Sequence, residues 1–324
     1  MAANSTAPGP ALLGSIDDYL GPRAQRFFGE GFKRAEHRIS EIRVVDGAVS
    51  ANVTVGYPAD WSRKGDRDQR PHLSTVDVLV LGAWLAEIQL AQVSGLTPAQ
   101  RADAVLIRAD IKAGTTPVED ELSGFLVTAG SPVVTPSSGG LVRSVFECVV
   151  GTLTLRCEIE HEPGVPNAEP AEFGTPEELL GEGGPRLFAE GHTSRRQFVE
   201  DVVADVAGVT ADAAVRIETL GGTALSASAL TVDTFVVGLQ LGQLLLYELD
   251  SVSRARSNTL WMRRTVLDCA RPAEPRAPRG PVTFRLENTK LLENSKGQVW
   301  RAADIVGEFQ GVRLRCSVAH RLPS

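Results

Sequence analysis

The feature that most constrains the fold of this chain is an internal repeat. "TVDVLVLG" at residues 75–82 returns 156 residues later as "TVDTFVVG" at residues 231–238. Two more pairs occur in the same order. "EIRVVDGAVSANVTV" (41–55) loosely matches "DVVADVAGVTADAAVRI" (201–217), and "LRCEIEH" (155–161) matches "LRCSVAH" (314–320). Self-similarity that keeps its order indicates a duplicated structural unit. We therefore predict that the 324 residues form two copies of one unit.

The residues inside each copy indicate what this unit is. Asp46-Gly47 separates two β-rich runs, which is a hairpin signal. Residues 76–93 and 232–249 contain no proline and are apolar on nearly every side, so each is predicted to be a helix surrounded by protein. Runs of partly alternating polar and apolar residues follow each helix and predict strands at 104–113, 144–161, 261–270, 282–292 and 311–320. A buried helix wrapped by an antiparallel sheet is the hot-dog arrangement, so the fold predicted is an α+β double hot dog.

The same reading sets the boundaries of the two copies. We expect an N-terminal arm at 1–25, a first hot-dog repeat at 26–161 and a second at 186–324. Residues 162–185 are rich in Pro, Gly and Glu and are predicted to be a linker.

Composition excludes several classes of function. A net charge of −7 argues against general nucleic-acid binding. The chain starts without a basic segment followed by an apolar core, and no run reaches the roughly 18 uninterrupted apolar residues of a membrane span, so a cytoplasmic protein is expected. The cysteines show no CxxC spacing and are expected to be reduced; they are Cys148, Cys157, Cys269 and Cys316.

Asp77 and Asp233 stand at the heads of the two predicted helices and are the first candidates for chemistry. A helix N-terminus suits a developing oxyanion, and a carboxylate there can act as a general base. The alternative is a helix cap, because Ser74-Thr75-Val76-Asp77 resembles a capping box and a cap would be duplicated too. Only the first copy has an approach rich in Arg that also contains His72, which favours Asp77 as the functional one.

The other polar candidates each have a functional and a structural interpretation. His72 is either an acid–base group or a solvated loop residue. Lys33 and Arg34 follow two glycines and either bind an anion or lie on a surface loop; Lys112 either contacts a phosphate or carboxylate or faces solvent. His161 and His320 are expected to pack at equivalent strand ends, and no metal site is predicted. There is no GxSxG elbow and no P-loop, so serine nucleophiles and phosphoryl transfer are poorly supported.

Three segments together resemble the avirulence protein D (AvrD) family of bacteria: "LLGSIDDYLGPRAQRFFGEGFKRAEHRI" (12–39), "RPHLSTVD" (70–77) and "IKAGTTP" (111–117). The resemblance runs from about residue 11 to the end of the chain. Members of that family direct the synthesis of syringolides, which are small acylated lactones derived from sugars. The family is akin to the A-factor synthases that make γ-butyrolactone signals.

The resemblance implies an enzyme that joins a β-ketoacyl thioester to a small ketose and then closes a lactone or butenolide ring. The donor would be acyl-ACP or acyl-CoA, without a further cofactor, and an acyl carrier protein would be a partner. Whether the double unit pairs again as a homodimer stays open.

By analogy with that reaction, Asp77 with His72 would deprotonate the ketose hydroxyl or the acidic α-carbon. Asp233 would do the matching task or serve as a cap. The cations expected to hold substrate are Lys33, Arg34, Arg70 and Lys112. Two rivals remain: a hot-dog dehydratase or thioesterase, and a non-catalytic small-molecule binding protein.

Overall fold

The computed structural model describes residues 11–114, 118–119, 122–181, 190–220, 229–271 and 277–323. The strands of the first half are β2 (Glu36–Val45), β3 (Ala48–Gly56), β6 (Val105–Lys112), β7 (Phe125–Ala129), β8 (Val133–Pro136), β9 (Val142–Val150) and β10 (Leu153–His161). Those of the second half are β12 (Arg195–Asp205), β13 (Thr210–Thr219), β14 (Trp261–Cys269), β15 (Arg279–Glu293), β16 (Val299–Phe309) and β17 (Val312–Arg321).

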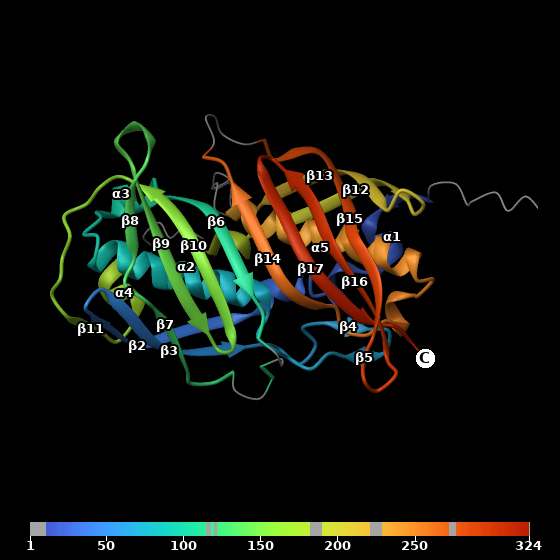
Figure 1. Ribbon diagram of the computed structural model, residues 1–324, viewed down its shortest axis with the longest axis horizontal. Coiled ribbons are helices and arrows are strands. Elements are labelled where there is room, and N and C mark those ends of the chain that lie inside the picture. The colour runs from blue at the N-terminus through green and yellow to red at the C-terminus, as the bar shows by residue number, and fades with distance from the viewer. Residues whose placement is uncertain are drawn as a thin grey trace, which may run out of the picture.

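These strands form one continuous antiparallel sheet whose order is mirrored about its centre (Figure 1). From the centre outward, the first half runs β6-β10-β9-β7-β3-β2 and the second half runs β14-β17-β16-β15-β13-β12. The halves join where β6 pairs with β14, with Ala109 opposite Leu267. The sheet is therefore that of a double hot dog, as the repeat predicted.

One long helix lies behind each half of the sheet: α2 (Thr75–Gln92) and α5 (Ala229–Leu249) (Figure 1). By length and composition either could cross a membrane, but the apolar windows are 83% and 100% buried inside the protein. Core helices enclosed by sheet have the same composition, since no face meets water. The prediction of two buried helices is confirmed.

The repeated glycines explain why the helix and strand motifs are duplicated together. A Cβ on Gly82 would come within 2.1 Å of Leu155, and a Cβ on Gly238 within 2.5 Å of Leu314. Each glycine thus lets the "LRC" strand of its own half approach the helix closely. The two sequence matches are the two sides of one contact.

Two of the expected boundaries are wrong. Residues 11–25 are not an arm: β1 (Ala11–Ser15) pairs with β12, α1 (Ile16–Leu20) follows, and Ile16 and Leu20 are buried in the core. The segment 162–185 contains β11 (Ala171–Phe173), which extends the sheet beside β2, and α4 (Pro176–Leu180). Residues 1–10 and 182–185 lie outside the described part of the chain.

A β-bulge in β2 and another in β12 show which residues of the two copies are equivalent. Glu41 and Asp201 are 160 residues apart, and both have left-handed backbone conformations, with φ of 53° and 51°. Each lies at the point where the pairing of β2 with β3, or of β12 with β13, shifts register. Four residues before them, His37 and Gln197 therefore occupy equivalent positions.

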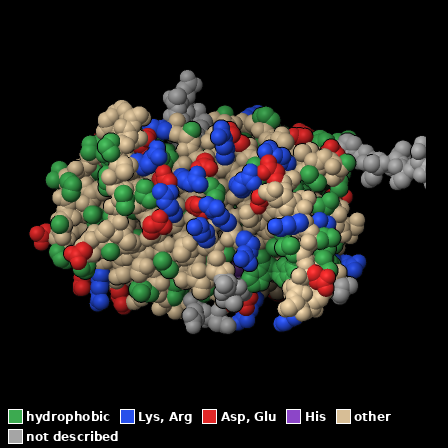
Figure 2. All heavy atoms as spheres, in the orientation of Figure 1, with side chains coloured by type: hydrophobic (Ala, Val, Ile, Leu, Met, Phe, Trp, Pro, Cys, Tyr) green, Lys and Arg blue, Asp and Glu red, His purple; other side chains and the backbone are tan. Residues whose placement is uncertain are grey.

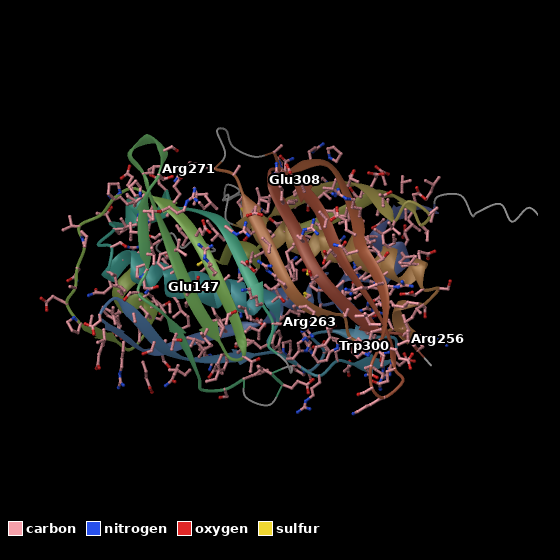
Figure 3. All side chains as sticks on the ribbon, in the orientation of Figure 1. Glu147, Arg256, Arg263, Arg271, Trp300 and Glu308 are labelled. Carbon is pink, nitrogen blue, oxygen red and sulfur yellow. The ribbon has the colours of Figure 1, made fainter. Side chains whose placement is uncertain are left out.

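Arginines on the outer face of the sheet pair with carboxylates of neighbouring strands. Cationic and anionic side chains alternate across it (Figure 2), and side chains on this face, such as Glu147 and Arg263, are labelled in Figure 3. Arg264 of β14 pairs with Asp110 of β6 at 2.5 Å, and Arg156 of β10 with Glu147 of β9 at 3.2 Å. Cross-strand ion pairs of this kind belong to a solvated sheet face. The four cysteines all lie in the described part of the chain, where they are buried and form no disulfide.

Candidate active site

Asp77 caps α2. The Asp77 amide donates to Ser74 Oγ at 3.2 Å, and the Ser74 amide donates to Asp77 Oδ2 at 2.7 Å, which completes a capping box. The prediction that Asp77 caps the helix is therefore correct. The cap does not account for the other contacts of the Asp77 side chain.

The same carboxylate also binds an imidazole and a phenol. His37 Nε2 lies 2.8 Å from Asp77 Oδ1, and the Tyr57 hydroxyl donates to Oδ2. Burial on its own would raise the pKa of Asp77, but the hydrogen bonds from His37, Tyr57 and Ser74 together hold that pKa below its ordinary value. An ionised carboxylate only accepts hydrogen bonds, so Nε2 of His37 carries its proton and Nδ1 is left as the basic nitrogen.

Asp233 has a different environment. Gln197 Nε2 donates to Oδ1 at 2.6 Å, and the Arg195 guanidinium contacts Oδ2. Asp233 is completely buried, and this burial raises its pKa despite the opposing effects of Arg195 and Gln197. Because His37 and Gln197 are equivalent, the two copies differ where an acid–base group would act. The imidazole is present only beside Asp77.

A second imidazole comes from the other half. His192 lies in the turn η4 (Glu190–His192), is 5% exposed, and neither ring nitrogen has a hydrogen-bond partner in the described part of the chain. Burial, followed by the neighbouring His37, lowers the pKa of His192 to about 4, while Asp77 opposes this. His192 is thus a neutral imidazole, within electrostatic reach of a dyad that belongs to the first half.

Lys33 belongs to the first half and lies close to charged residues of the second half. Its side chain is 7% exposed and pairs with Glu30 at 3.0 Å, and Glu30 also faces Arg196 of β12 at 3.7 Å. Burial lowers the pKa of Lys33, and Asp233 is one of the anions that oppose this. The two helix heads therefore share one polar interface.

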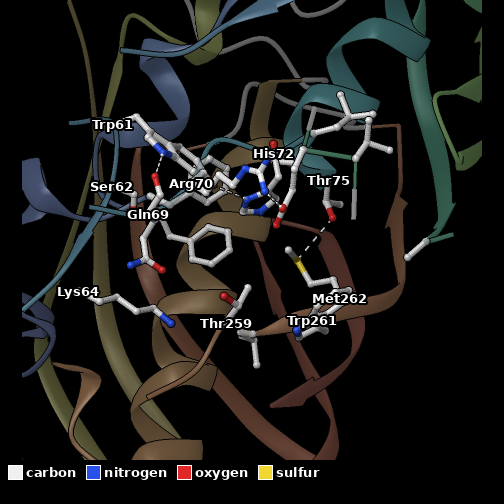
Figure 4. Close-up of a pocket in the computed structure, with 18 of the residues that line it drawn as sticks. Trp61, Ser62, Lys64, Gln69, Arg70, His72, Thr75, Thr259, Trp261 and Met262 are labelled. Atoms are coloured by element: carbon white, nitrogen blue, oxygen red, sulfur yellow. Dashed lines mark hydrogen bonds and ion pairs between the residues drawn. The ribbon is translucent and has the colours of Figure 1, made fainter. Parts of the chain in front are cut away.

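A pocket of about 210 Å³ opens beside the start of α2 (Figure 4). Its apolar wall contains Phe27, Phe28, Leu260, Trp261 and Met262, and its polar lining includes Arg26, Lys64, Arg70, His72 and Arg254. The first half supplies the stretch before α2, and the second half supplies the segment that leads into β14. A ligand here would contact both halves.

Ser74 joins this pocket to the buried dyad. It lines the pocket, together with Thr75, and its hydroxyl donates to Asp77 Oδ2 at 2.7 Å. Trp61 also lines the pocket, and the centroid of its ring lies 4.6 Å from that of Tyr57 and 5.4 Å from that of His72, so aromatic packing connects the pocket to the dyad. The first turn of α2 therefore faces the pocket on one side and the dyad on the other.

The expected site residues fall into three groups. Arg70 and His72 line the pocket, with Arg70 paired to Glu119 at 2.9 Å and His72 Nδ1 lying 3.1 Å from the Arg70 carbonyl oxygen. His72 is not among the hydrogen-bond partners found for Asp77, where His37 stands instead. Lys33 and Asp233 act electrostatically on each other, and Lys33 and Asp77 both act on His192, so these residues lie near the interface of the halves.

Arg34 and Lys112 lie outside the pocket lining. Arg34 pairs with the exposed Asp60 at 2.6 Å. Lys112 is exposed at the end of β6, between Thr154 and Arg264 of the neighbouring strands. Within the described ranges, no group of three or more His, Cys, Asp or Glu is placed to hold a metal.

Sequence reasoning missed His37, Tyr57 and His192. A fourth repeat would have found two of them. "FFGEGFKRAEH" (27–37) and "LFAEGHTSRRQ" (187–197) share Phe, Glu and Gly at an offset of 160. Aligned on that motif, His37 falls opposite Gln197 and His192 opposite Phe32, so each copy carries one histidine that the other lacks. Tyr57 has no such signal.

A family model described as "Pseudomonas avirulence D protein (AvrD)" matches residues 11–323. A comparison with curated protein sequences gives no match. Among solved structures, a tesB protein of Mycobacterium avium subspecies paratuberculosis is similar at 7% identity and a TM-score of 0.40, over 85% of this chain and 93% of that one. The dehydratase domain of RzxB from Pseudomonas fluorescens is similar at 16% identity and a TM-score of 0.36, over 94% and 100%. The acyl-CoA thioesterase II TesB2 of Mycobacterium marinum is similar at 10% identity and a TM-score of 0.38, over 86% and 93%.

Proposed function

The chain belongs to the AvrD family, and from this we propose that it is an acyltransferase-type enzyme that acts on β-ketoacyl thioesters. It joins the acyl group, delivered by an acyl carrier protein or CoA, to a small ketose and closes a lactone or butenolide ring. The product is a signalling molecule or secondary metabolite. The observation that carries the proposal is the buried His37–Asp77 dyad at the start of an apolar core helix, next to a pocket shared by both halves.

The first step is acyl transfer. A hydroxyl of the ketose attacks the thioester carbonyl, the new C–O bond forms, the C–S bond breaks, and the thiol leaves with the proton. Nδ1 of His37 takes this proton from the hydroxyl, because Asp77 fixes the tautomer through Nε2. In the first turn of α2 the Asp77 N–H is capped by Ser74, whereas the N–H groups of Thr75 and Val76 have no acceptor further back in the helix and suit the negative charge that develops on the carbonyl oxygen.

The second step is ring closure. The carbon between the two carbonyls of the β-ketoacyl group is acidic, and the same base removes its proton. The resulting carbanion attacks the ketose carbonyl, and the alkoxide receives the proton back. Loss of water then gives a butenolide. One dyad can serve both steps because each starts with removal of a proton by a neutral base.

His192 favours a second candidate, a dehydratase. That reaction removes the α-proton of a β-hydroxyacyl thioester and protonates the leaving hydroxyl, so it needs two acid–base groups. His192 of the second half could remove the α-proton, whereas Asp77 of the first half is ionised and would have to take up a proton before it could protonate the leaving hydroxyl. A histidine that faces Asp233 would favour a dehydratase further, but Asp233 is contacted by Arg195 and Gln197.

A non-catalytic binding protein is disfavoured. Its pocket would be apolar with no ionisable group reaching it, whereas Lys64, His72 and Arg254 line this one.

One experiment separates the candidates. The protein is incubated with a β-ketoacyl thioester and either xylulose or dihydroxyacetone phosphate, and separately with a β-hydroxyacyl thioester, and the products are analysed by mass spectrometry. The proposal predicts thiol release together with a new ester or lactone mass. Thiol release without such a mass indicates a thioesterase, and conversion of a β-hydroxyacyl thioester to an enoyl thioester indicates a dehydratase. Absence of turnover with every acyl chain length contradicts all three.

A further inference from the structure

The pocket contains positive charge that no carboxylate in the described part of the chain neutralises. Four cations line it: Arg26, Lys64, Arg70 and Arg254. Arg70 pairs with Glu119 at 2.9 Å, and Arg26 contacts Asp17. Lys64 and Arg254 form no ion pair within the described ranges.

Both of these side chains are satisfied by backbone carbonyls. Lys64 Nζ donates to the Asn258 oxygen at 2.6 Å, and Arg254 Nη2 donates to the Arg63 oxygen at 2.5 Å. Lys64 belongs to β4 (Arg63–Lys64) of the first half, and Arg254 belongs to η5 (Arg254–Arg256) of the second half. A carbonyl satisfies a hydrogen bond but leaves the net charge of the cation in place, so the pocket stays electropositive.

Lys64 is buried in this setting. It is 9% exposed, and burial, followed by the charges of Arg254 and Arg67, lowers its pKa to about 8. A buried cation without a counter-ion is costly, and such perturbed groups cluster at functional sites. Figure 4 shows the Lys64 side chain reaching from β4 toward Thr259, with Trp261 and Met262 on the apolar side.

We propose that Lys64 and Arg254 form a subsite for the phosphoryl group of a substrate, at the cationic end of the pocket. The inference rests on the proposed function, which supplies two sources of that group: the pantetheine phosphate of the acyl donor or a phosphorylated ketose acceptor. Lysine provides a point charge and arginine a planar fork of donors, which together match the oxygens of a phosphate. The apolar wall of the same pocket then faces the acyl chain or the sugar carbons.

The test is phosphate binding without any acyl donor. Inorganic phosphate is titrated into the protein at constant ionic strength and followed by calorimetry. We expect saturable binding that Lys64→Gln and Arg254→Gln each weaken about tenfold or more, as loss of a charge-assisted hydrogen bond would. Arg256→Gln is the matched control, because Arg256 is an exposed cation of the same turn that does not line the pocket (Figure 3). Equal weakening by all three variants, or no saturable binding to the wild type, overturns the subsite.

A thermal-shift measurement on the wild type tests the subsite even if a variant fails to fold. Phosphate should raise the melting temperature of the wild type above that in chloride of equal ionic strength. Absence of this shift overturns the subsite without any variant.

Competition then identifies the source of the phosphoryl group. Displacement of phosphate by dihydroxyacetone phosphate but not by dihydroxyacetone assigns the subsite to the acceptor, and displacement by CoA assigns it to the donor. Phosphate that neither ligand displaces contradicts a substrate subsite. Because no thioester is present, failure here leaves thiol release intact, and failure of acyl transfer leaves phosphate binding intact.

Discussion

At the scale of single residues, the chain itself supplies the best variant for testing the dyad. Gln197 takes the position of His37 in the second copy and still donates to its aspartate. His37→Gln should therefore keep the hydrogen bond to Asp77 and remove only the basic nitrogen. We expect product formation to fall about 100-fold or more, with the melting temperature within a few degrees of wild type. A variant that retains its activity would contradict a catalytic role for His37.

Asp77 needs a control for its role as a cap. Asp77→Asn should lower activity at least as much as His37→Gln, because the ionised carboxylate that fixes the imidazole is lost. Thr97→Ala removes the capping box of α3 (Pro98–Ala102), far from the dyad in the chain, and should cost about 1 kcal/mol of stability without loss of activity. If Asp77→Asn matches Thr97→Ala in both assays, the aspartate is a cap alone.

His192 predicts a pH dependence of stability. Its pKa is about 4 in the folded protein and about 6.5 when unfolded, so the unfolded chain binds more protons and stability falls as the pH drops from 6.5 toward 4. Between pH 7 and pH 5 this amounts to about 2 kcal/mol. Lys33, His37, Asp77 and Arg195 act on the same ring.

The pH effect is measured as the difference between wild type and His192→Gln, by urea denaturation at both pH values. The variant should lose about 2 kcal/mol less than wild type on acidification. Equal losses in the two proteins would show that His192 does not titrate as its burial indicates.

At the scale of elements, the contact between each core helix and its sheet predicts two different outcomes for one substitution. Gly238→Ala would bring its Cβ within 2.6 Å of the Phe284 ring as well as 2.5 Å of Leu314, whereas Gly82→Ala meets only the flexible end of Leu155. Alanine favours helix over glycine by about 1 kcal/mol, and overpacking costs about 1–3 kcal/mol. Gly238→Ala should thus lower the free energy of unfolding more than Gly82→Ala in chemical denaturation. The reverse order would contradict this packing.

Much of the secondary structure could be predicted from the sequence, because its signals are local or are duplicated in the two copies. The apolar helices, the Asp46-Gly47 hairpin and the strands after each helix come from composition and periodicity, and all are confirmed. Residues 11–25 were missed because a short strand followed by a five-residue helix carries little periodic signal, and its pairing partner β12 lies far along the chain.

The site was less predictable for a related reason. His37 lies 40 residues before Asp77, and the two come together because the fold packs α2 against β2. His72 is close to Asp77 in sequence, yet its ring packs against Trp61 and it is not among the hydrogen-bond partners found for Asp77. Proximity along the chain was therefore a poor guide, whereas comparison of the two copies would have been a better one.

At the scale of the whole molecule, the halves are interlocked. β1 precedes the first repeat but pairs with β12 of the second, and the Phe28 ring lies 5.8 Å from Phe235 of α5. The central β6–β14 pair makes one sheet of both halves. We expect a single cooperative transition in calorimetry, with equal calorimetric and van't Hoff enthalpies. Two resolved transitions would show that the repeats are independent.

This interlocking gives the duplication a functional meaning. One copy keeps the imidazole at the helix head and the other keeps the buried neutral histidine, while the pocket needs side chains from both. Divergence of the copies at equivalent positions thus allows one composite site in place of two identical ones.

The central claim is that the His37–Asp77 dyad removes a proton during acyl transfer from a β-ketoacyl thioester. The most direct measurement compares wild type with His37→Gln on the thioester and ketose, and follows thiol release and product mass together. The account predicts that wild type yields the thiol and the new ester or lactone mass at the same rate, and that the variant yields neither above background while it remains folded. Equal product from both proteins would contradict it.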